Sequence, residues 1–223
     1  MIQLKHVTKE YQIGDDVIKA LDDITLDIQA GEFIAIMGVS GSGKSTLLNI
    51  LGCMDRPSSG EYFLDGVSVN RLNDRELSRI RNRKVTFVFQ HFALMEKYTA
   101  YENIELPLLQ RRLSRSERRK TIIQAASQLG IEDQLSKLPK QMSGGQQQRA
   151  AIARALASGA EILLADEPTG ALDRKTGETL MSIFHELNQQ GKTIIIVTHD
   201  PMVAQYASRT IYLSDGRIDQ YAV

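Results

Sequence analysis

The sequence predicts an α/β fold with a parallel sheet, because short apolar runs of strand character alternate with a helical pattern. The last third of the chain shows this alternation most clearly. Ile162–Ala165 and Thr193–Thr198 are apolar runs, and Leu180, Phe184 and Leu187 between them are spaced as one face of a helix. A strand, a helix and a strand in that order indicate a βαβ unit.

The first third of the chain predicts strands. Alternation of apolar and polar residues over Ile24–Ile28 is typical of a half-buried strand, and the apolar run Phe33–Met37 indicates a buried one. The segments Tyr62–Leu64 and Val67–Val69 flank Asp65-Gly66, a dipeptide that favours a two-residue hairpin. We therefore expect an antiparallel element in addition to the parallel sheet.

The middle of the chain predicts helices inserted into this core. Ser114 and Glu117 have the spacing of a capping box, and Gly130 suits the position after a helix. The insertion is expected to run from about Gln90 to Leu156. The predicted organisation is a single domain over 1–223, with a core of 1–89 and 158–223 and a helical subdomain of 90–157.

Composition excludes several classes of protein. Hydrophobic residues make up 42% and charged residues 24%, which is typical of a globular protein and not of a disordered one. The net charge of +0 gives no global attraction to nucleic acid, so no nucleic-acid partner is expected. Apolar runs are far shorter than the ~20 residues that span a membrane, and the N-terminus lacks a signal-peptide pattern. We expect a cytosolic chain whose membrane role, if it has one, comes through a partner.

One segment has the full pattern of a phosphate-binding loop. Residues 38–45 fit G-x-x-x-x-G-K-[ST], follow a predicted strand and precede a helix-like stretch. Glycines let backbone N–H groups turn inward around phosphate oxygens, Lys44 supplies a positive charge, and the Ser45 hydroxyl suits Mg²⁺. The residues predicted to bind ATP here are Gly38, Ser40, Gly41, Ser42, Gly43, Lys44, Ser45 and Thr46.

Polar side chains follow two further strands. Asp166 and Glu167 come directly after Ile162–Ala165, and His199 follows Thr193–Thr198. Ligands of parallel sheets bind at the carboxyl ends of strands, where the phosphate loop also lies. Asp166 is therefore predicted to hold Mg²⁺, Glu167 to polarise a water for attack on the γ-phosphate, and His199 to hydrogen-bond that phosphate.

A second glycine-rich segment precedes another predicted helix. Ser143-Gly144-Gly145-Gln146 leads toward the helix-forming stretch Ala150–Ala157, which predicts a small-residue loop at a helix start and thus a second anion nest. One phosphate loop is enough to hold ATP, so this second nest requires a separate explanation.

The ordered motifs resemble those of ATP-binding cassette (ABC) transporter ATPases over nearly the whole chain. Residues 142–146 are similar to the family signature, with Met142 where Leu is commonest. The resemblance implies a P-loop NTPase (RecA-like) core with an antiparallel β-subdomain and an inserted α-helical subdomain. It also implies a head-to-tail homodimer that sandwiches two ATP molecules. In that dimer Ser143, Gly144, Gly145 and Gln146 of one chain cap the γ-phosphate held by Lys44 of the other.

Further positions match the family in turn. Tyr11 resembles the aromatic residue that stacks on adenine, the alternative being a core tyrosine. Gln90 resembles the glutamine that contacts Mg²⁺ and the attacking water, and Asp173 the aspartate at the dimer interface. Ser is frequent in the family where Gly170 stands, so contacts between subunits at that position can differ here.

Two segments narrow the resemblance. Leu51–Pro57 and Thr99–Pro107 resemble the macrolide-exporter and lipoprotein-release branch, and peptide-resistance transporters share much of this pattern. The implied function is an ATP- and Mg²⁺-dependent ATPase that powers a separate membrane permease exporting a peptide, an antibiotic or a lipoprotein. The chain would then lie at the cytoplasmic face of the membrane. The alternative is a soluble ABC ATPase acting on the ribosome or DNA; a third hypothesis, a non-catalytic regulator, is disfavoured by Glu167 and His199.

Two stretches are rich in basic residues. Residues 111–120 hold six basic residues and one acid, and residues 71–84 are similarly rich but include Asp74 and Glu76. A solvated helix face is the favoured interpretation. The functional alternative is attraction to anionic lipid headgroups beneath the partner.

Overall fold

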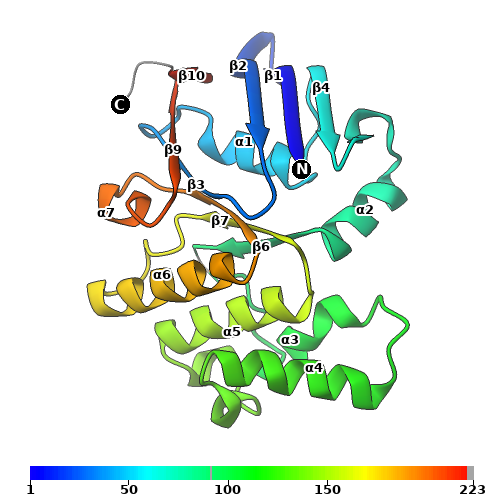
Figure 1. Cartoon of the computed structure of the whole chain (residues 1–223), viewed down its shortest axis with the longest axis vertical. Coiled ribbons are helices and arrows are strands. Elements are labelled where there is room, and N and C mark those ends of the chain that lie inside the picture. The colour runs from blue at the N-terminus through cyan, green and yellow to red at the C-terminus, as the bar shows by residue number, and fades with distance from the viewer. Residues whose placement is uncertain (91, 220–223) are drawn as a thin grey trace.

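The structure is a computed structural model that describes residues 1–90 and 92–219. Its central sheet consists of β3 Phe33–Met37, β6 Val85–Phe89, β7 Ile162–Asp166, β8 Thr193–Val197, β9 Arg209–Ser214 and β10 Arg217–Asp219. Their order is β10-β9-β3-β8-β7-β6 (Figure 1). The pairs from β9 to β6 are all parallel, as the sequence predicts, and β10 adds an antiparallel edge.

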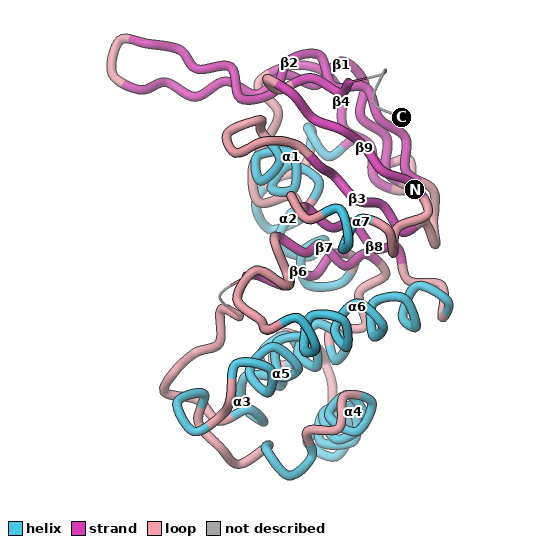
Figure 2. Tube along the Cα trace, turned by 90° about the vertical axis from the view of Figure 1, so that its left-hand side faces the viewer, coloured by secondary structure: helices cyan, strands magenta, loops and turns pink. Residues whose placement is uncertain are grey.

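A second sheet of four strands covers one end of the molecule. It consists of β1 Ile2–Ile13, β2 Asp16–Ile28, β4 Ser59–Leu64 and β5 Val67–Ser68, in the order β2-β1-β4-β5. All of its pairs are antiparallel, and the β1–β2 hairpin projects from the body of the molecule (Figure 2). Leu64 pairs with Val67 across Asp65-Gly66, which confirms the predicted two-residue hairpin.

Helices form the rest of the fold. They are α1 Lys44–Leu51, α2 Asp74–Arg83, α3 Ala100–Glu105, α4 Arg115–Gln128, α5 Gly144–Ala157, α6 Arg174–Gln189 and α7 Pro201–Ala204. Short 3₁₀ turns occur at η1 Val69–Arg71, η2 Leu106–Leu108, η3 Glu132–Gln134 and η4 Pro139–Gln141. Helices α3, α4 and α5 gather at the end of the molecule opposite the four-stranded sheet (Figure 1). The division into core and helical subdomain stays a prediction, and the predicted domain end, 220–223, lies outside the described residues.

Strand β3 is apolar throughout because both of its faces are covered. Ile34 and Ile36 join the cluster that contains α1 and the inner residues of the four-stranded sheet. Phe33, Ala35 and Met37 join the opposite cluster, which contains the buried faces of α5 and α6. A parallel strand with helices on one face and a sheet on the other needs a continuous hydrophobic run, not an alternating one.

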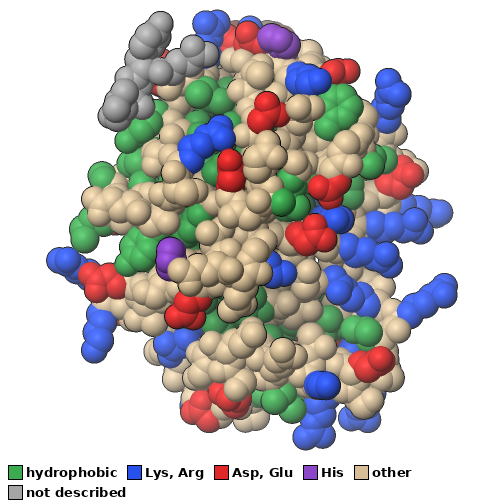
Figure 3. Space-filling model, in the orientation of Figure 1, with side chains coloured by type: hydrophobic (Ala, Val, Ile, Leu, Met, Phe, Trp, Pro, Cys, Tyr) green, Lys and Arg blue, Asp and Glu red, His purple; other side chains and the backbone are tan. Residues whose placement is uncertain are grey.

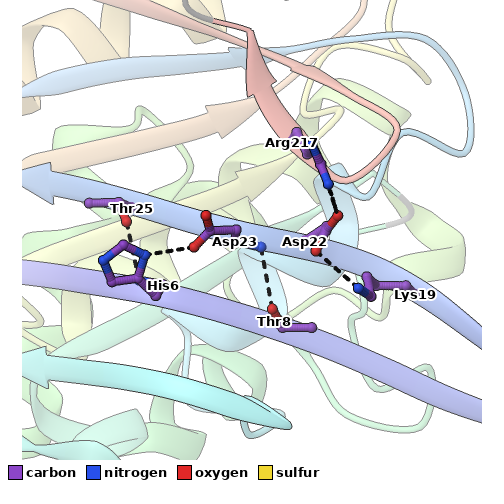
Figure 4. A network of polar contacts seen from close by, with 7 residues as sticks. All are labelled: His6, Thr8, Lys19, Asp22, Asp23, Thr25 and Arg217. Carbon is purple, nitrogen blue, oxygen red and sulfur yellow. Dashed lines mark hydrogen bonds and ion pairs between the residues drawn. The ribbon is translucent and has the colours of Figure 1, made fainter.

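The two sheets are joined by a polar network around β2. Asp22 on β2 accepts from the guanidinium of Arg217 on β10 and from Lys19, while His6 Nδ1 lies 2.7 Å from Asp23 Oδ1 (Figure 4). His6 and Asp23 both have positive φ and lie where the β1–β2 ladder shifts register. The Asp22 N–H also donates to the Gly216 carbonyl oxygen at 2.8 Å, and Lys19 and Ala20 of β2 lie beside the phosphate loop.

Helix caps account for the starts of α4 and α5. The sequence predicted the first of these correctly and the second wrongly. Ser114 and Glu117 form the predicted capping box of α4, and Gly130 follows that helix with positive φ. Residues 143–146, however, are not a loop before a later helix. The Ser143 hydroxyl accepts from the Gln146 N–H, and Gln146 Oε1 accepts from the Ser143 N–H, so α5 already begins at Gly144.

We expect substitutions in β8 to test the central sheet. Ile195 is fully buried in β8, so Ile195→Ala should lower the free energy of unfolding by about 2–5 kcal/mol. The matched control is Ile123→Ala on α4, where the side chain is 42% exposed, and a change within about 0.5 kcal/mol is expected. Urea unfolding followed by circular dichroism measures both. Equal losses in the two variants would contradict the assignment of β8 to the core.

Candidate active site

The phosphate loop connects β3 to α1 and is pressed between two other strands. A Cβ on Gly43 would lie 2.4 Å from the carbonyl oxygen of Ala20 on β2, and one on Gly38 would lie 2.2 Å from that of Leu213 on β9. Gly43 also has φ of 100°, a left-handed conformation that favours glycine. Glycine is therefore required on both sides of the loop by backbone packing, in addition to any role in binding phosphate.

Helix α1 presents free backbone donors at its start. Among the α-helices of residues 1–90 and 92–219, α1 alone has no side-chain hydrogen bond at its N-cap, which is Gly43. Unpaired N–H groups and the positive end of the helix dipole together favour an anion at this position. The Lys44 ammonium lies back over the loop and donates to the carbonyl oxygens of Gly38 at 2.8 Å and Val39 at 2.7 Å.

Asp166 lies at the end of β7, next to α1. Burial raises the pKa of its carboxyl group, and a hydrogen bond from the Ser45 hydroxyl opposes that shift. Ser45 and Asp166 thus place a hydroxyl oxygen and a carboxylate together beside the phosphate loop. Mg²⁺ binds proteins through one or two such oxygens and completes its shell with water and phosphate oxygens. The two residues fit that requirement.

Glu167 is held in a strained conformation by its neighbours. Its φ is 44°, which is unusual for a residue with a side chain, and its N–H donates to the Val197 carbonyl on β8. His199 Nδ1 lies 2.7 Å from Glu167 Oε1, and the Thr198 hydroxyl donates to Oε2 at 3.3 Å. Each oxygen of the carboxylate is thus bound by one of the two residues that follow β8. Thr198 was not among the predicted site residues, although its position between β8 and His199 indicated a place in the site.

These elements line one groove of about 760 Å³. The predicted residues that line it are Ser40, Gly41, Gly43, Lys44, Ser45, Thr46, Asp166, Glu167 and His199. Ile18, Lys19 and Ala20 of β2 form another wall, which the sequence did not predict. The structure therefore brings together the phosphate loop and both polar strand ends, as expected from the carboxyl edge of a parallel sheet.

Gln90 lies at the end of β6 but does not line this groove. Its Nε2 is close to Gly170, where an added Cβ would lie 2.7 Å away. Any side chain at position 170 would therefore occupy the space that the Gln90 side chain fills.

The residues after Gln90 are held by an arginine that the sequence analysis missed. Phe92 and Ala93 both have positive φ, and Arg154 donates to their carbonyl oxygens at 3.0 Å and 2.6 Å. Burial lowers the pKa of the Arg154 guanidinium, which makes no ion pair with any described residue. Arg154 belongs to α5, so the glycine-rich helix start and the segment after Gln90 are parts of one packed unit. No local pattern in the sequence links these positions.

The residues of the predicted second anion nest lie outside this groove. Ser143, Gly144, Gly145 and Gln146 do not line the groove of the phosphate loop. Gly145 instead faces Thr176 at the start of α6, where an added Cβ would lie 2.9 Å from Thr176 Cγ2. Asp173 is the N-cap of α6 and accepts from the Thr176 N–H and hydroxyl. Asp173 and the nest are thus neighbours within one chain, away from Lys44.

Tyr11 lies near the groove and has polar contacts of its own. Its hydroxyl donates to Asp55 Oδ2 at 2.8 Å, and Lys9 Nζ lies 4.8 Å from the ring centroid. Burial is the main cause that raises the pKa of the Tyr11 hydroxyl, and a hydrogen bond with Thr46 has the opposite effect. Tyr11 as a residue is 36% exposed, so it is not the core tyrosine of the alternative interpretation.

Comparison with known proteins supplies the family. The family model described as ABC transporter matches residues 21–170. An uncharacterized ABC transporter ATP-binding protein of Methanocaldococcus jannaschii, MJ0796, is 51% identical and covers 99% of this chain and 96% of its own length. The macrolide export ATP-binding/permease protein MacB of Photorhabdus laumondii is 49% identical over 98% of this chain, which spans 34% of MacB.

Solved structures agree with the sequence comparison. A dimeric structure of MJ0796 in a post-hydrolysis state, bound to ADP and Pi, is similar with a TM-score of 0.91, 49% identity and coverage of 99% of this chain and 97% of that chain. The protein cbiO1 of Clostridium perfringens, part of the transporter complex cbiONQ, gives a TM-score of 0.87 at 29% identity over 98% and 86% of the two chains. The P-loop NTPase fold is confirmed, and the chain belongs to the ABC transporter family as one of its ATP-hydrolysing cassettes.

Proposed function

We propose that this ATPase works as a homodimer with two ATP molecules at the interface, and that ATP-driven closure of the dimer powers a separate membrane permease. The observation that carries the proposal is the position of residues 143–146. They lie at the start of α5, where the sequence predicts an anion nest, and do not line the groove of Lys44 in their own chain. A second chain, arranged head to tail, would bring its nest to that groove. The dimeric MJ0796 structures support homodimerisation.

In this proposal the phosphates of ATP bind at the start of α1. Lys44 leaves the carbonyl oxygens of Gly38 and Val39 for the β- and γ-phosphates, and the loop N–H groups donate to the remaining phosphate oxygens. Ser45 and Asp166 would hold Mg²⁺, which neutralises charge on the phosphates when it is bound. The exposed Tyr11 is proposed to stack on the adenine through the ring face that Lys9 leaves free.

Glu167 is proposed to be the general base. Thr198 and His199 each bind one of its carboxylate oxygens, which fixes the direction in which the carboxylate accepts a proton. Water positioned against the γ-phosphate would give its proton to this carboxylate as its oxygen bonds to the γ-phosphorus, while the bond from that phosphorus to the bridging oxygen breaks and ADP leaves. His199, with a side chain that is 74% exposed, is proposed to turn its other ring nitrogen toward the γ-phosphate. Gln90 is proposed to move from Gly170 toward the attacking water and Mg²⁺ when the dimer closes.

The permease is proposed to dock beside β6. A groove of about 270 Å³ is lined there by apolar residues that include Met54, Phe87, Phe89 and Pro107, together with Ala93. We name it the β6 groove. Arg154 also lines it, so a segment of the permease in this groove would contact the unit that holds the residues after Gln90. Among the described residues no helix is long and apolar enough to span a bilayer, and MacB relatives carry a permease in the same chain.

The cargo and the location belong to the same proposal. The proposed cargo is a peptide, an antibiotic or a lipoprotein, and the name of the MacB relatives, macrolide export, supports an antibiotic among these. The cassette is proposed to lie at the cytoplasmic face of the membrane. A soluble ATPase acting on the ribosome or DNA is less well supported, because the relatives and the cbiO1 structure are named as transporter components and the chain has no net positive charge.

We expect Glu167→Gln to separate chemistry from binding. The amide keeps the shape of the side chain but cannot accept the proton, so ATP hydrolysis should fall by about 10²–10⁴-fold. Affinity for a fluorescent ATP analogue should stay within a few-fold of the wild type, whereas Lys44→Ala should weaken it strongly. Near wild-type hydrolysis by Glu167→Gln would show that another residue is the base.

A mixing experiment tests the composite site. Lys44→Ala disables the phosphate loop, and Ser143→Arg blocks the nest. If each site combines one loop and one nest from different chains, a mixed dimer has one site with both defects and one intact site. Mixing should then restore hydrolysis that neither parent shows. The control mixes Lys44→Ala with Glu167→Gln. Both residues belong to the phosphate-loop half of the site, so each site of the mixed dimer contains one defective half and neither site is intact. Equal activity in the two mixtures would contradict the proposal.

A further inference from the structure

The two basic stretches of the sequence meet in one groove. Arg79 and Arg83 of α2 line it from one side, and Arg111 and Arg112, which precede α4, line it from the other. Its volume is about 800 Å³, and its remaining lining residues include no carboxylate. Lys and Arg side chains gather along the right-hand side of Figure 3, over the region where Figure 1 draws α2. We name this site the arginine groove.

None of the four arginines has an acidic partner among residues 1–90 and 92–219. The carboxylates on the surrounding elements are engaged elsewhere. Asp74 pairs with Arg56 and Glu76 caps α2, both at the opposite end of that helix from Arg83. Three more are occupied in the same way: Glu105 by Arg118, Glu117 by the cap of α4, and Glu161 by Lys84.

Arg111 is fixed in place while its charge remains uncompensated. Its guanidinium donates to the carbonyl oxygens of Asn82, at 2.9 Å, and Ser158, and its buried Nε has no hydrogen-bond partner in the described chain. Burial, and secondarily the nearby charge of Arg83, lower the pKa of Arg111. Like charges brought together without a counter-ion repel one another, so an anion in the groove would relieve that repulsion. A merely solvated surface would not require an arginine that is partly buried and held by two carbonyl oxygens.

We propose that the arginine groove binds the phosphate headgroups of anionic phospholipids at the membrane surface beside the permease. Planar guanidinium groups bind phosphate oxygens in bidentate fashion, and four of them line this one groove. The position fits such a ligand, because the arginine groove and the β6 groove are both lined by residues of α2. Asn82 lines the arginine groove, and its neighbour Arg81 lines the β6 groove. The inference rests on the proposed function, since it needs a chain that works at a membrane.

The test uses the intact wild-type chain and sealed vesicles. Flotation measures binding to vesicles of phosphatidylcholine alone or mixed with phosphatidylglycerol, at low and high salt. Binding is expected with phosphatidylglycerol, and it should weaken as salt rises. Arg79→Gln with Arg112→Gln removes two exposed guanidiniums that make no side-chain hydrogen bond or ion pair within the described part of the chain, and should weaken binding about tenfold. Arg115→Gln with Arg119→Gln is the control, because it removes the same charge from α4 outside the groove and should change binding less than about twofold.

Each other result overturns the proposal in a distinct way. Equal losses in the two double variants would mean that general surface charge, and not the groove, attracts the vesicles. Binding of inorganic phosphate in calorimetry without any preference for phosphatidylglycerol vesicles would assign the groove to a free anion. If the Arg79→Gln, Arg112→Gln variant no longer co-purified with the permease but still bound vesicles, the arginine groove would be assigned to an acidic protein segment. Hydrolysis in the Lys44→Ala and Ser143→Arg mixture tests the dimer separately, so failure of the lipid proposal is distinguishable from failure of the proposed function.

Discussion

The close packing of backbone against the phosphate loop is the constraint on which the site depends. Carbonyl oxygens of Ala20 and Leu213 approach the loop from two sides, at positions where Gly43 and Gly38 leave no room for a side chain. The loop is therefore shaped by β2 and β9 before any ligand arrives. The same contact sets the start of α1, so its unpaired N–H groups and Lys44 point into the groove. A site made this way loses little freedom on binding phosphate.

The parallel sheet then decides which residues share that groove and which do not. Because β7 and β8 are neighbours in register, Glu167 meets Thr198 and His199 at the carboxyl edge. The helical part is built differently: Arg154 holds Phe92 and Ala93, and through them α5 is tied to the segment after Gln90. The start of α5 and Glu167 at the edge of the sheet thus lie on different elements, and α5 packs on the sheet through a shared hydrophobic cluster. In the proposed function, ATP at the interface would act on both elements at once.

Sequence alone predicts the parts of this molecule that depend on local patterns. The strand β3, the loop between β3 and α1, the Asp65-Gly66 hairpin and the cap at Ser114 follow from spacing and residue type, and the structure confirms each of these elements. The start of α5 was misjudged because two glycines suggested a loop, whereas the reciprocal bonds of Ser143 and Gln146 stabilise a helix. Two features were not predictable from the sequence: the hydrogen bond from Arg154 to the Ala93 carbonyl oxygen, and the groove that arginines of two separate stretches line together. Each joins segments that only the folded chain brings together.

In the proposed composite site, one chain holds only half of the residues that bind ATP. The most direct measurement is the mass in solution of the Glu167→Gln chain, by sedimentation equilibrium, with and without saturating ATP and Mg²⁺. We expect a monomer without nucleotide and a dimer with ATP, because the phosphates of two nucleotides would bridge the two chains at the proposed nests of residues 143–146. Ser143→Arg in the same background should prevent that dimer. A chain that remains monomeric with saturating ATP would contradict the claim.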